Sequence, residues 1–324
     1  MARISVIVPV YNGERYLEEC LDSIAGQSFA DFEAIVVNDG SIDGTEGIIL
    51  KFCNKDNRFR YLKTENEGVS SARNMGIDNA GGDYLTFVDA DDCLQPEALE
   101  RMLELAEGNG AEVCICSFTQ GDIFSPSPIE KECPEIYSYP KAMKRALYQS
   151  RIMNSAWGAL FARSLLKPNI RFRVGIRYED LDAFYRFYEK AEKIVYTREP
   201  LYFYRKNKDG FIRNWSIERL DALDVTDRIE EYVTERYPSL KGAARDRRFS
   251  AHFNIMMLLI SNNIEDGPAI ERCFKIIKRY RLRTLLDPHV RVKNKIGALL
   301  SFGGVEFIKR LAQGESSGAG GDTK

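Results

Sequence analysis

Apolar runs alternate with amphipathic stretches along roughly the first third of the chain. Residues 4–10 and 34–37 are nearly uninterrupted apolar runs rich in β-branched side chains, which predict strands buried on both faces. Between them, apolar residues recur at helical spacing over 17–24. Further strands are expected at 83–88 and 113–118, each preceded by a helix. Strands that alternate with helices predict an α/β fold with a mainly parallel central sheet.

Polar clusters come directly after three of these strands. They are Tyr11-Asn12-Gly13, Asn38-Asp39-Gly40-Ser41 and Asp89-Ala90-Asp91-Asp92. Ligands of parallel sheets bind at the carboxyl ends of the strands. We therefore expect these clusters to meet at one ligand site.

From about Trp215 onward the pattern changes to helices without strong strands. A chain of 324 residues suits about two domains. We predict a first domain over residues 1–214, a helical and basic region over 215–311, and a disordered tail over 312–324, where small residues and glycines dominate.

Composition narrows the class of protein. Lys plus Arg number 46 and Asp plus Glu 48, a net charge of -2 that argues against a nucleic-acid-binding surface. Seven cysteines without a CxxC pair fit neither a disulfide framework nor a zinc site, and two histidines exclude a site with several His ligands. Without a signal peptide or an apolar run of about 20 residues, we expect a cytoplasmic protein, soluble or peripheral on the inner face of the membrane.

Two carboxylates stand out as a cation site. Asp89 and Asp91 are two positions apart at a strand end, so both point to the same face. Close carboxylates repel each other unless a cation lies between them, and hard oxygen ligands favour Mg²⁺ or Mn²⁺. The alternative is a polar turn that caps the next helix, and Asp92 either joins the site or only caps.

Four other positions are open to two interpretations. Asp39 can bind a base or ribose, or be an ordinary turn residue. Arg73 can pair with phosphate oxygens or lie at the surface. Glu179-Asp180 begins a predicted helix, where the dipole favours acids in any case, and neighbours diverge by about 100°, so one of the two is expected to face the cleft. Trp157 can stack on a sugar or be a core aromatic.

Six motifs in order resemble those of glycosyltransferase family 2, the inverting transferases with a GT-A fold, a Rossmann-like nucleotide-sugar-binding domain. The motifs are Ser5-Val6-Ile7-Val8-Pro9-Val10-Tyr11-Asn12, Val37-Asn38-Asp39-Gly40-Ser41-Ile42-Asp43-Gly44-Thr45, Asn66-Glu67-Gly68 with Ala72-Arg73-Asn74, Asp89-Ala90-Asp91-Asp92, Trp157-Gly158-Ala159-Leu160-Phe161 and Tyr178-Glu179-Asp180. The resemblance runs from residue 3 to about 213. Each motif alone is a weak signal, whereas six in order are specific.

The resemblance implies how a nucleotide-sugar donor would be held. It assigns nucleotide binding to Pro9, Tyr11, Asp39, Arg73 and Asp89. The first three would contact the base, most often uracil, and Arg73 the base or the diphosphate. Asp89 and Asp91 would bind ribose and Mg²⁺ or Mn²⁺, a Lewis acid that would stabilise the leaving nucleoside diphosphate.

The resemblance also implies how an acceptor would react. Asp180, with Glu179 beside it, would be the general base that removes the proton of the acceptor hydroxyl. Trp157 and Asp92 would line the pocket for acceptor and donor. A single displacement inverts the configuration at the anomeric carbon. The implied acceptor is a saccharide or a lipid-linked saccharide, as in bacterial cell-surface polysaccharide synthesis.

The sequence departs from the family pattern at one late motif. Phe211 stands where relatives often carry a Ser, which puts phosphate contacts from that loop in doubt. The processive-synthase signature Gln-x-x-Arg-Trp is absent, which predicts single additions. A nucleotidyltransferase is disfavoured, because Tyr11-Asn12-Gly13-Glu14-Arg15 stands where its Gly-rich phosphate loop would be. A non-catalytic scaffold that kept the fold is the remaining alternative.

Residues 271–311 form a basic segment. They hold eleven Lys or Arg and three Asp or Glu, a net charge of +8, against -10 for the rest of the chain. Apolar residues are interleaved with the basic ones. Such a segment either lies on an anionic membrane surface or forms a helical subdomain with a basic, solvated face.

Overall fold

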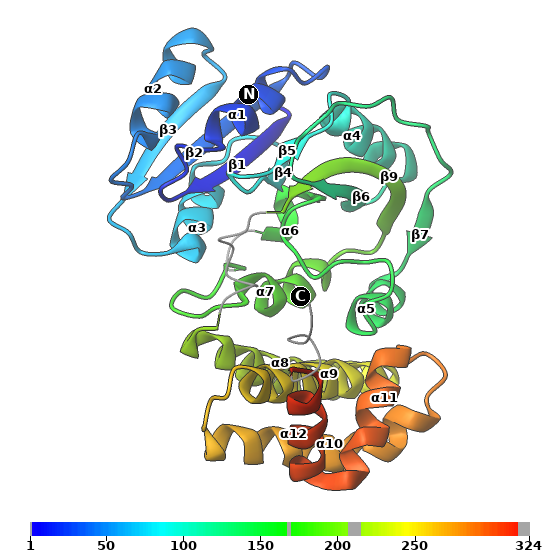
Figure 1. Ribbon diagram of the computed structural model, residues 1–324. Coiled ribbons are helices and arrows are strands. Elements are labelled where there is room, and N and C mark those ends of the chain that lie inside the picture. The colour runs from blue at the N-terminus through cyan, green and yellow to red at the C-terminus, as the bar shows by residue number, and fades with distance from the viewer. Residues whose placement is uncertain (1, 167–169, 207–214, 317–324) are drawn as a thin grey trace, which may run out of the picture. The chain divides into compact units, whose positions relative to one another are not determined.

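The computed structural model describes residues 2–166, 170–206 and 215–316 (Figure 1). The chain divides into two compact units, one of residues 1–142 with 154–210 and the other of residues 143–153 with 211–324. The sequence predicted a single boundary at 214. The segment 143–153 belongs to the second unit because the end of helix α5 (Tyr139–Leu147) and the turn after it contact the C-terminal helices, for example through Tyr148 and Asp287.

The first unit is built on a nine-stranded sheet in the order β3-β2-β1-β4-β8-β6-β9-β5, with β7 also paired to β9. The strands are β1 (Ile4–Val10), β2 (Phe32–Asp39), β3 (Phe59–Thr64), β4 (Tyr84–Phe87), β5 (Cys93–Leu94), β6 (Val113–Gly121), β7 (Glu135–Tyr137), β8 (Ala159–Ala162) and β9 (Ile194–Arg205). The helices are α1 (Leu17–Ala25), α2 (Thr45–Lys55), α3 (Val69–Asn79), α4 (Ala98–Asn109), α6 (Arg163–Leu166) and α7 (Glu179–Tyr188).

The parallel part of the sheet is β3-β2-β1-β4. Beyond it the sheet is mixed, because β8 runs antiparallel to both β4 and β6, while β6 and β9 are parallel. Two short runs in the sequence, 194–196 and 201–204, are rich in aliphatic and aromatic residues and predict two separate strands. They form the single strand β9, which stays continuous because it pairs in turn with β7, β6 and β5.

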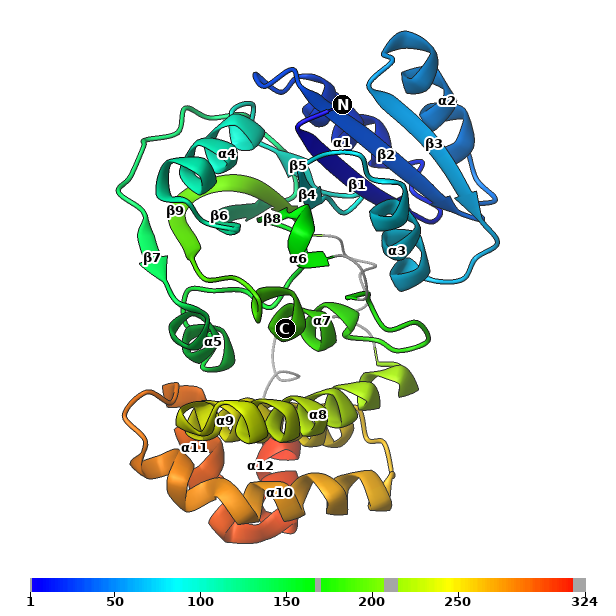
Figure 2. The ribbon, with the colours of Figure 1, turned by 180° about the vertical axis from the view of Figure 1, so that it is seen from behind.

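Burial on both faces explains the apolar character of β1. Val6 and Val8 point into a core shared with α1, α2 and α4. Ile7 points to the opposite face, where α3 lies against β1 and β2 (Figure 2). Gly76 of α3 approaches so closely that a Cβ there would lie 2.4 Å from Ile7 Cγ2. The small residue therefore sets the position of α3 on the sheet.

The polar clusters meet at one edge of the sheet, as the sequence predicted. In the parallel register Val10 lies opposite Asn38, so the loops after β1 and β2 are adjacent. The Asn12 backbone N–H donates to Ser41 Oγ at 2.9 Å, and Asn12 Oδ1 accepts from the Ile42 N–H at 3.0 Å. Asn12 has a φ of 50°, a left-handed conformation that Asn tolerates. The two loops are thus tied together.

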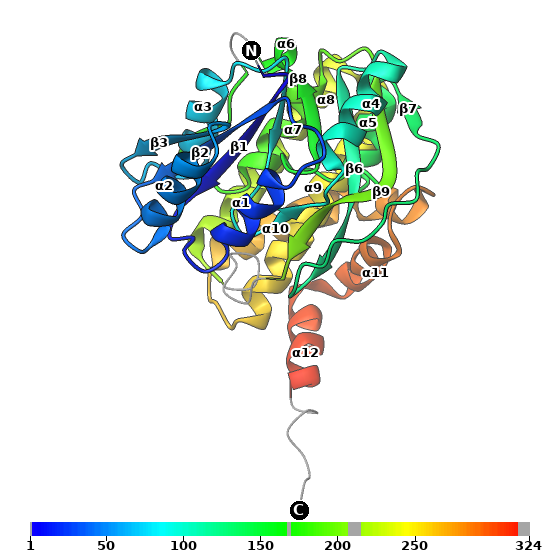
Figure 3. The ribbon, with the colours of Figure 1, turned by 90° about the horizontal axis from the view of Figure 1, so that it is seen from above.

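The second unit is helical. Its elements are η1 (Ile217–Leu220), α8 (Asp221–Arg236), η2 (Pro238–Leu240), α9 (Lys241–Ser261), α10 (Gly267–Leu286), α11 (Val292–Leu300), η3 (Ser301–Gly303) and α12 (Gly304–Ser316). Figure 3 shows α12 running on in a new direction after α11. Helix α12 includes residues 312–316, which the sequence assigned to a disordered tail, and 317–324 lie outside the described residues. No helix in the described ranges is long and apolar enough to cross a bilayer.

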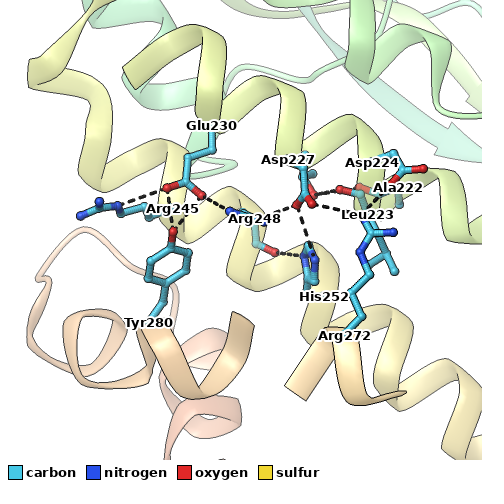
Figure 4. Close-up of polar contacts among 11 residues, drawn as sticks. Ala222, Leu223, Asp224, Asp227, Glu230, Arg245, Arg248, His252, Arg272 and Tyr280 are labelled. Carbon is cyan, nitrogen blue, oxygen red and sulfur yellow. Dashed lines mark hydrogen bonds and ion pairs between the residues drawn. The ribbon is translucent and has the colours of Figure 1, made fainter. Parts of the chain in front are cut away.

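A network of charged side chains lies between α8, α9 and α10 (Figure 4). Glu230 of α8 accepts from Arg248 Nη1 at 2.9 Å and from the Tyr280 hydroxyl at 2.7 Å. Asp227 pairs with Arg248 Nε at 2.5 Å and Arg272 Nη2 at 3.0 Å. These contacts join all three helices, so the network supports the packing of the second unit.

Candidate active site

Three carboxylates surround the guanidinium of Arg73. Arg73 Nη2 donates to Asp89 Oδ1 at 2.9 Å. Its Nη1 donates to Glu179 Oε1 and Asp180 Oδ1, each at 2.7 Å. The Arg73 side chain is only 3% exposed. The structure therefore brings together Arg73 of α3, Asp89 of the loop after β4, and both acids of the first turn of α7. The expectation that only one of Glu179 and Asp180 faces this site is wrong, because the Arg73 guanidinium reaches both carboxylates.

Burial and charge shift the acidity of this group. Burial raises the pKa of Asp180 to about 7, and the charges of Glu179 and Asp89 act in the same direction. Arg73 and a hydrogen bond from the backbone of Ala156 oppose the shift. A carboxylate with a pKa near 7 is suited to accept a proton at neutral pH.

Arg73 keeps its charge in this setting. Burial alone would lower its pKa, but the three carboxylates raise it above the usual value. Arg73 also contacts Phe172, and the guanidinium carbon lies 5.2 Å from the centre of the Phe172 ring. Arg73 Nε is buried without a hydrogen-bond partner among the described residues. The guanidinium therefore hydrogen-bonds to the three carboxylates inside the protein and does not lie at the protein surface.

The loop after β4 is anchored by Asp92. Asp92 is 1% exposed, and its carboxylate accepts from the Tyr202 hydroxyl at 2.7 Å and the Arg205 backbone N–H at 2.8 Å. The Tyr202 hydroxyl also accepts from the Asp89 N–H at 3.2 Å. Burial, and then the charges of Asp89 and Asp91, raise the pKa of Asp92 to about 8. Asp92 therefore links the acidic loop to β9.

Arg205, at the end of β9, is a residue whose role its position in the sequence leaves ambiguous. Its Nε donates to the Asp91 carbonyl at 2.7 Å, and its Nη1 donates to the Asp122 carbonyl at 2.8 Å. Its Nη2 pairs with Glu19. The aromatic and basic run at the end of β9 was the available signal, but its partners are far away in sequence. The Phe211 motif lies outside the described residues.

The residues present fit a divalent cation. Among the described residues no group of three or more His, Cys, Asp or Glu side chains is arranged to hold a metal. Two carboxylates suffice for Mg²⁺ when substrate phosphates complete the shell. Asp89 and Asp91 give the loop the negative charge that helps to raise the pKa of Asp92. Carboxylates close to one another repel, and a cation bound between them relieves that repulsion.

The predicted base-binding residues lie at the neighbouring strand ends. Pro9 is buried in β1, and Tyr11 is 48% exposed in the loop after it. Asp39 is 3% exposed and accepts from Thr64 Oγ1 at 2.5 Å and from the N–H groups of Glu67 and Gly68, each at 2.8 Å. These donors precede α3. Asp39 thus braces the helix that carries Arg73, a role the sequence did not predict.

Trp157 belongs to an aromatic cluster against β9. Its ring stacks on Tyr202 with centroids 4.7 Å apart and on Tyr204 at 5.5 Å, and it meets Phe118 edge-on at 5.2 Å. Trp157 is partly buried. Because the hydroxyl of Tyr202 bonds Asp92, the stack supports the ring that holds the acidic loop.

Comparison with known proteins identifies the family. Residues 5–168, about half of the chain, match the family described as Glycosyl transferase family 2. The chain belongs to this family. Glycosyltransferase GlyG of Streptococcus pneumoniae is 33% identical over 220 residues, which cover 65% of this chain and 73% of GlyG. Glycosyltransferase GlyA of the same organism is 34% identical over 253 residues, 75% of this chain and 36% of GlyA. The chain thus spans about a third of GlyA.

Solved structures share the GT-A fold of this family. Residues 1–349 of TarS from S. aureus, in complex with UDP-GlcNAc, align with a TM-score of 0.69 and 21% identity, over 98% of this chain and 92% of that one. The mannosyltransferase PcManGT from Pyrobaculum calidifontis, in complex with GDP-Man and Mn²⁺, aligns with a TM-score of 0.57 and 16% identity, over 97% and 83%. At these identities the likeness shows the fold.

Proposed function

We propose that the chain catalyses metal-dependent, inverting transfer of a sugar from a nucleotide-sugar, with a UDP-sugar as the leading candidate, to a saccharide or lipid-linked acceptor in cell-surface polysaccharide synthesis. The observation that carries the proposal is the single cluster formed by Arg73, Asp89, Glu179 and Asp180. It joins a carboxylate suited to the donor side with one suited to deprotonate an acceptor. The nucleotide-sugars bound by the two solved relatives support the donor class.

Asp180 is the general base in this proposal. The oxygen of the acceptor hydroxyl attacks the anomeric carbon, and its proton passes to the Asp180 carboxylate. The bond between the anomeric carbon and the diphosphate oxygen breaks, so the diphosphate leaves with the electron pair. Since attack and departure take place on opposite faces of the sugar, the configuration inverts. The raised pKa of Asp180, about 7, suits a base that works near neutral pH.

Asp89 and Asp91 hold the donor side. Mg²⁺ or Mn²⁺ would be bound by these two carboxylates, and when bound it supplies positive charge against the leaving diphosphate. Asp92, through Tyr202 and Arg205, keeps the loop in place. Pro9 and Tyr11 are proposed to contact the base from the adjacent loop, with Asp39 ordering the next one.

Arg73 is assigned a different role from the one that the resemblance implied. Its two terminal nitrogens already bond three carboxylates at 2.7–2.9 Å. We therefore treat Arg73 as a positioning residue that fixes Asp180 relative to Asp89. Lysine carries the same charge but presents one ammonium group and not a planar fork, so it cannot span the same three partners in the same geometry.

The proposal is tested by calorimetric titration of the whole chain with UDP, GDP, CDP and ADP, each in Mn²⁺, Mg²⁺ or EDTA. We expect one nucleotide to bind with metal, and binding to be lost in EDTA and in Asp91→Ala. Asp31→Ala, a change at an exposed aspartate of the same unit, is the matched control and should bind normally. If folded protein binds no nucleotide under any condition, the scaffold alternative replaces the transferase.

A further inference from the structure

Helix α11 carries its larger aliphatic side chains on the outside. Val292 is 72% exposed, Ile296 52% and Leu299 59%. The residues that it buries are Asn294, Gly297 and Ala298. Helices on the surface of a soluble unit normally show the reverse arrangement. The outer stripe therefore calls for an explanation beyond folding of the unit.

The inner face of α11 is fixed by close packing. A Cβ at Gly297 would lie 2.8 Å from the ring of Phe253 of α9, so only glycine fits at that distance. Asn294 Nδ2 donates to Asp246 Oδ1 at 2.9 Å. These contacts set the rotation of the helix. The aliphatic residues consequently stay on the outside, and nothing in the packing of α11 requires them there.

Lysines flank the apolar stripe on both sides. At 100° per residue, Val292, Ile296 and Leu299 fall within about 60° of one another, and Lys293 and Lys295 lie on opposite sides of them. Neither lysine has an ion-pair partner among the side chains described for residues 2–166, 170–206 and 215–312. Long lysine stems can lie along an apolar boundary while their ammonium groups remain in water.

Further exposed apolar residues lie just before and just after α11 in the chain. Phe302, 51% exposed, follows the helix, and the guanidinium carbon of Arg281 lies 4.0 Å from the centre of its ring. Leu286, 83% exposed, ends α10 shortly before α11 begins. The surrounding segment, 271–311, has a net charge of +8. Exposed aliphatic and aromatic residues within a basic surface are typical of helices that lie at the boundary of anionic lipid.

We propose that the outer stripe of α11, Val292, Ile296 and Leu299 with Lys293 and Lys295, docks on the surface of an anionic phospholipid bilayer. A second copy of the chain fits this surface less well. A two-fold contact would place the same basic patch against itself, where like charges repel. An anionic bilayer offers both an apolar layer for the stripe and negative headgroups for the lysines.

The test is sedimentation of the whole chain with vesicles, without donor or acceptor, so that its outcome is independent of the proposed transfer reaction. Vesicles of phosphatidylcholine with about one third phosphatidylglycerol are compared with pure phosphatidylcholine. We expect binding to the anionic vesicles that weakens as salt rises. Ile296→Ser with Leu299→Ser should reduce the partition coefficient at least about tenfold. Lys293→Gln with Lys295→Gln should reduce it about fivefold for each charge removed.

Matched controls are available in the same chain. Ile217→Ser removes an aliphatic residue that is 64% exposed and lies in the second unit outside the stripe, and it should leave binding unchanged. Lys55→Gln with Lys190→Gln removes two exposed charges from the first unit. The proposal is overturned if the chain does not sediment with anionic vesicles, or sediments equally with neutral ones. It is also overturned if the chain is a dimer that the Ile296→Ser, Leu299→Ser variant converts to monomer.

Discussion

Each unit of the molecule contains a group of carboxylates around arginine side chains, and the two groups differ in charge balance. In the first unit, the guanidinium of Arg73 faces Asp89, Glu179 and Asp180. In the second, three carboxylates face three arginines. The members of that network are Asp224, Asp227 and Glu230, with Arg245, Arg248 and Arg272 (Figure 4).

The pKa values of the carboxylates in the two groups reflect the different ratios of carboxylates to arginines. Glu230 is desolvated, but hydrogen bonds from Tyr280 and the arginines hold its pKa below the usual value. Asp180 is partly buried, and desolvation together with the charges of Glu179 and Asp89 raises its pKa to about 7, because the one arginine that opposes the shift is shared among three carboxylates. The balanced network joins α8, α9 and α10 and so supports the packing of these helices. The unbalanced group, with three carboxylates and one arginine, has a surplus of negative charge and a carboxylate, Asp180, with a raised pKa. A site that binds a cation and accepts a proton needs both properties.

The largest effect is expected for Asp180→Asn. The amide cannot take the acceptor proton, so kcat should fall about 10²–10⁴-fold, the usual contribution of a general base. Nucleotide binding should persist, because the proposed function places Asp180 with the acceptor and Asp89 with the donor. Product formation from a UDP-sugar donor gives kcat, and calorimetry gives the affinity.

Two controls accompany this variant. Asp78→Asn alters an aspartate in the same unit whose side chain is 58% exposed, and it should leave kcat unchanged. Glu179→Gln changes the other acid that faces Arg73. If Asp180→Asn keeps full activity while Glu179→Gln loses it, the assignment of the base passes to Glu179 and the class of reaction stands.

The next largest effect is a difference in stability between variants of the two charge groups. Arg73→Met leaves three carboxylates without a counter-charge and should cost about 3–5 kcal/mol in free energy of unfolding. Arg248→Met leaves Glu230 with Arg245 and Tyr280, so about 1–3 kcal/mol is expected. The chain has two tryptophans, Trp157 in the first unit and Trp215 in the second.

Single-tryptophan backgrounds measure each unit separately. Fluorescence of Trp157 in a Trp215→Phe background follows denaturant unfolding of the first unit, and Trp215 in a Trp157→Phe background follows the second. An equal or greater loss for Arg248→Met would contradict the contrast in charge balance, since it would mean that the second network depends on one arginine as much as the first.

Much of the fold could be predicted because the first half of the chain has local signals. The double-sided burial of β1 requires an apolar run, and Asn12 and Gly40 mark the turns after parallel strands. The membership of residues 143–153 in the second unit was not predictable, since it depends on contacts such as Tyr148 with Asp287, 139 positions away. The same holds for the antiparallel placement of β8 between β4 and β6.

The sequence predicted which residues form the candidate site better than it predicted which hydrogen bonds they make. Asp89, Asp180 and Arg73 stand in recognisable motifs, and the structure places them in contact. That Arg73 bonds carboxylates, and that Asp39 caps the loop before α3, depends on side-chain directions that spacing does not encode. The bonds of Arg205 to the loop after β4 span more than 110 positions, beyond any local pattern.

The two units should also respond to acid in opposite directions. Burial lowers the pKa of His252 to about 4, whereas the unfolded chain binds this proton near 6.5. Stability of the second unit is therefore lost as pH falls from 6.5 toward 4, by about 2 kcal/mol between pH 7 and 5. Asp180, with its pKa of about 7 against 3.8 unfolded, takes up a proton first in the folded state. The first unit should gain stability over the same range.

Unfolding midpoints at pH 5, 6 and 7 in EDTA, followed through Trp215 and Trp157 separately, give the two slopes. In His252→Gln the pH dependence seen through Trp215 should flatten, and in Asp180→Asn the opposite slope seen through Trp157 should shrink. Two slopes of the same sign would show that the charge balance of the clusters does not control how each unit titrates.

The smallest effect is the pH dependence of the reaction. A base must be ionised to accept a proton, so kcat/KM should rise about tenfold per pH unit below pH 7 and level off above it. The charge of Arg73 lowers the pKa of Asp180, so Arg73→Gln should move this rise to higher pH, and Arg73→Lys should move it less. A merely structural role for Arg73 would lower the rate at every pH without moving the profile. A rise centred near pH 4 would contradict the geometry, because it would require a base that is exposed to water and free of the other carboxylates.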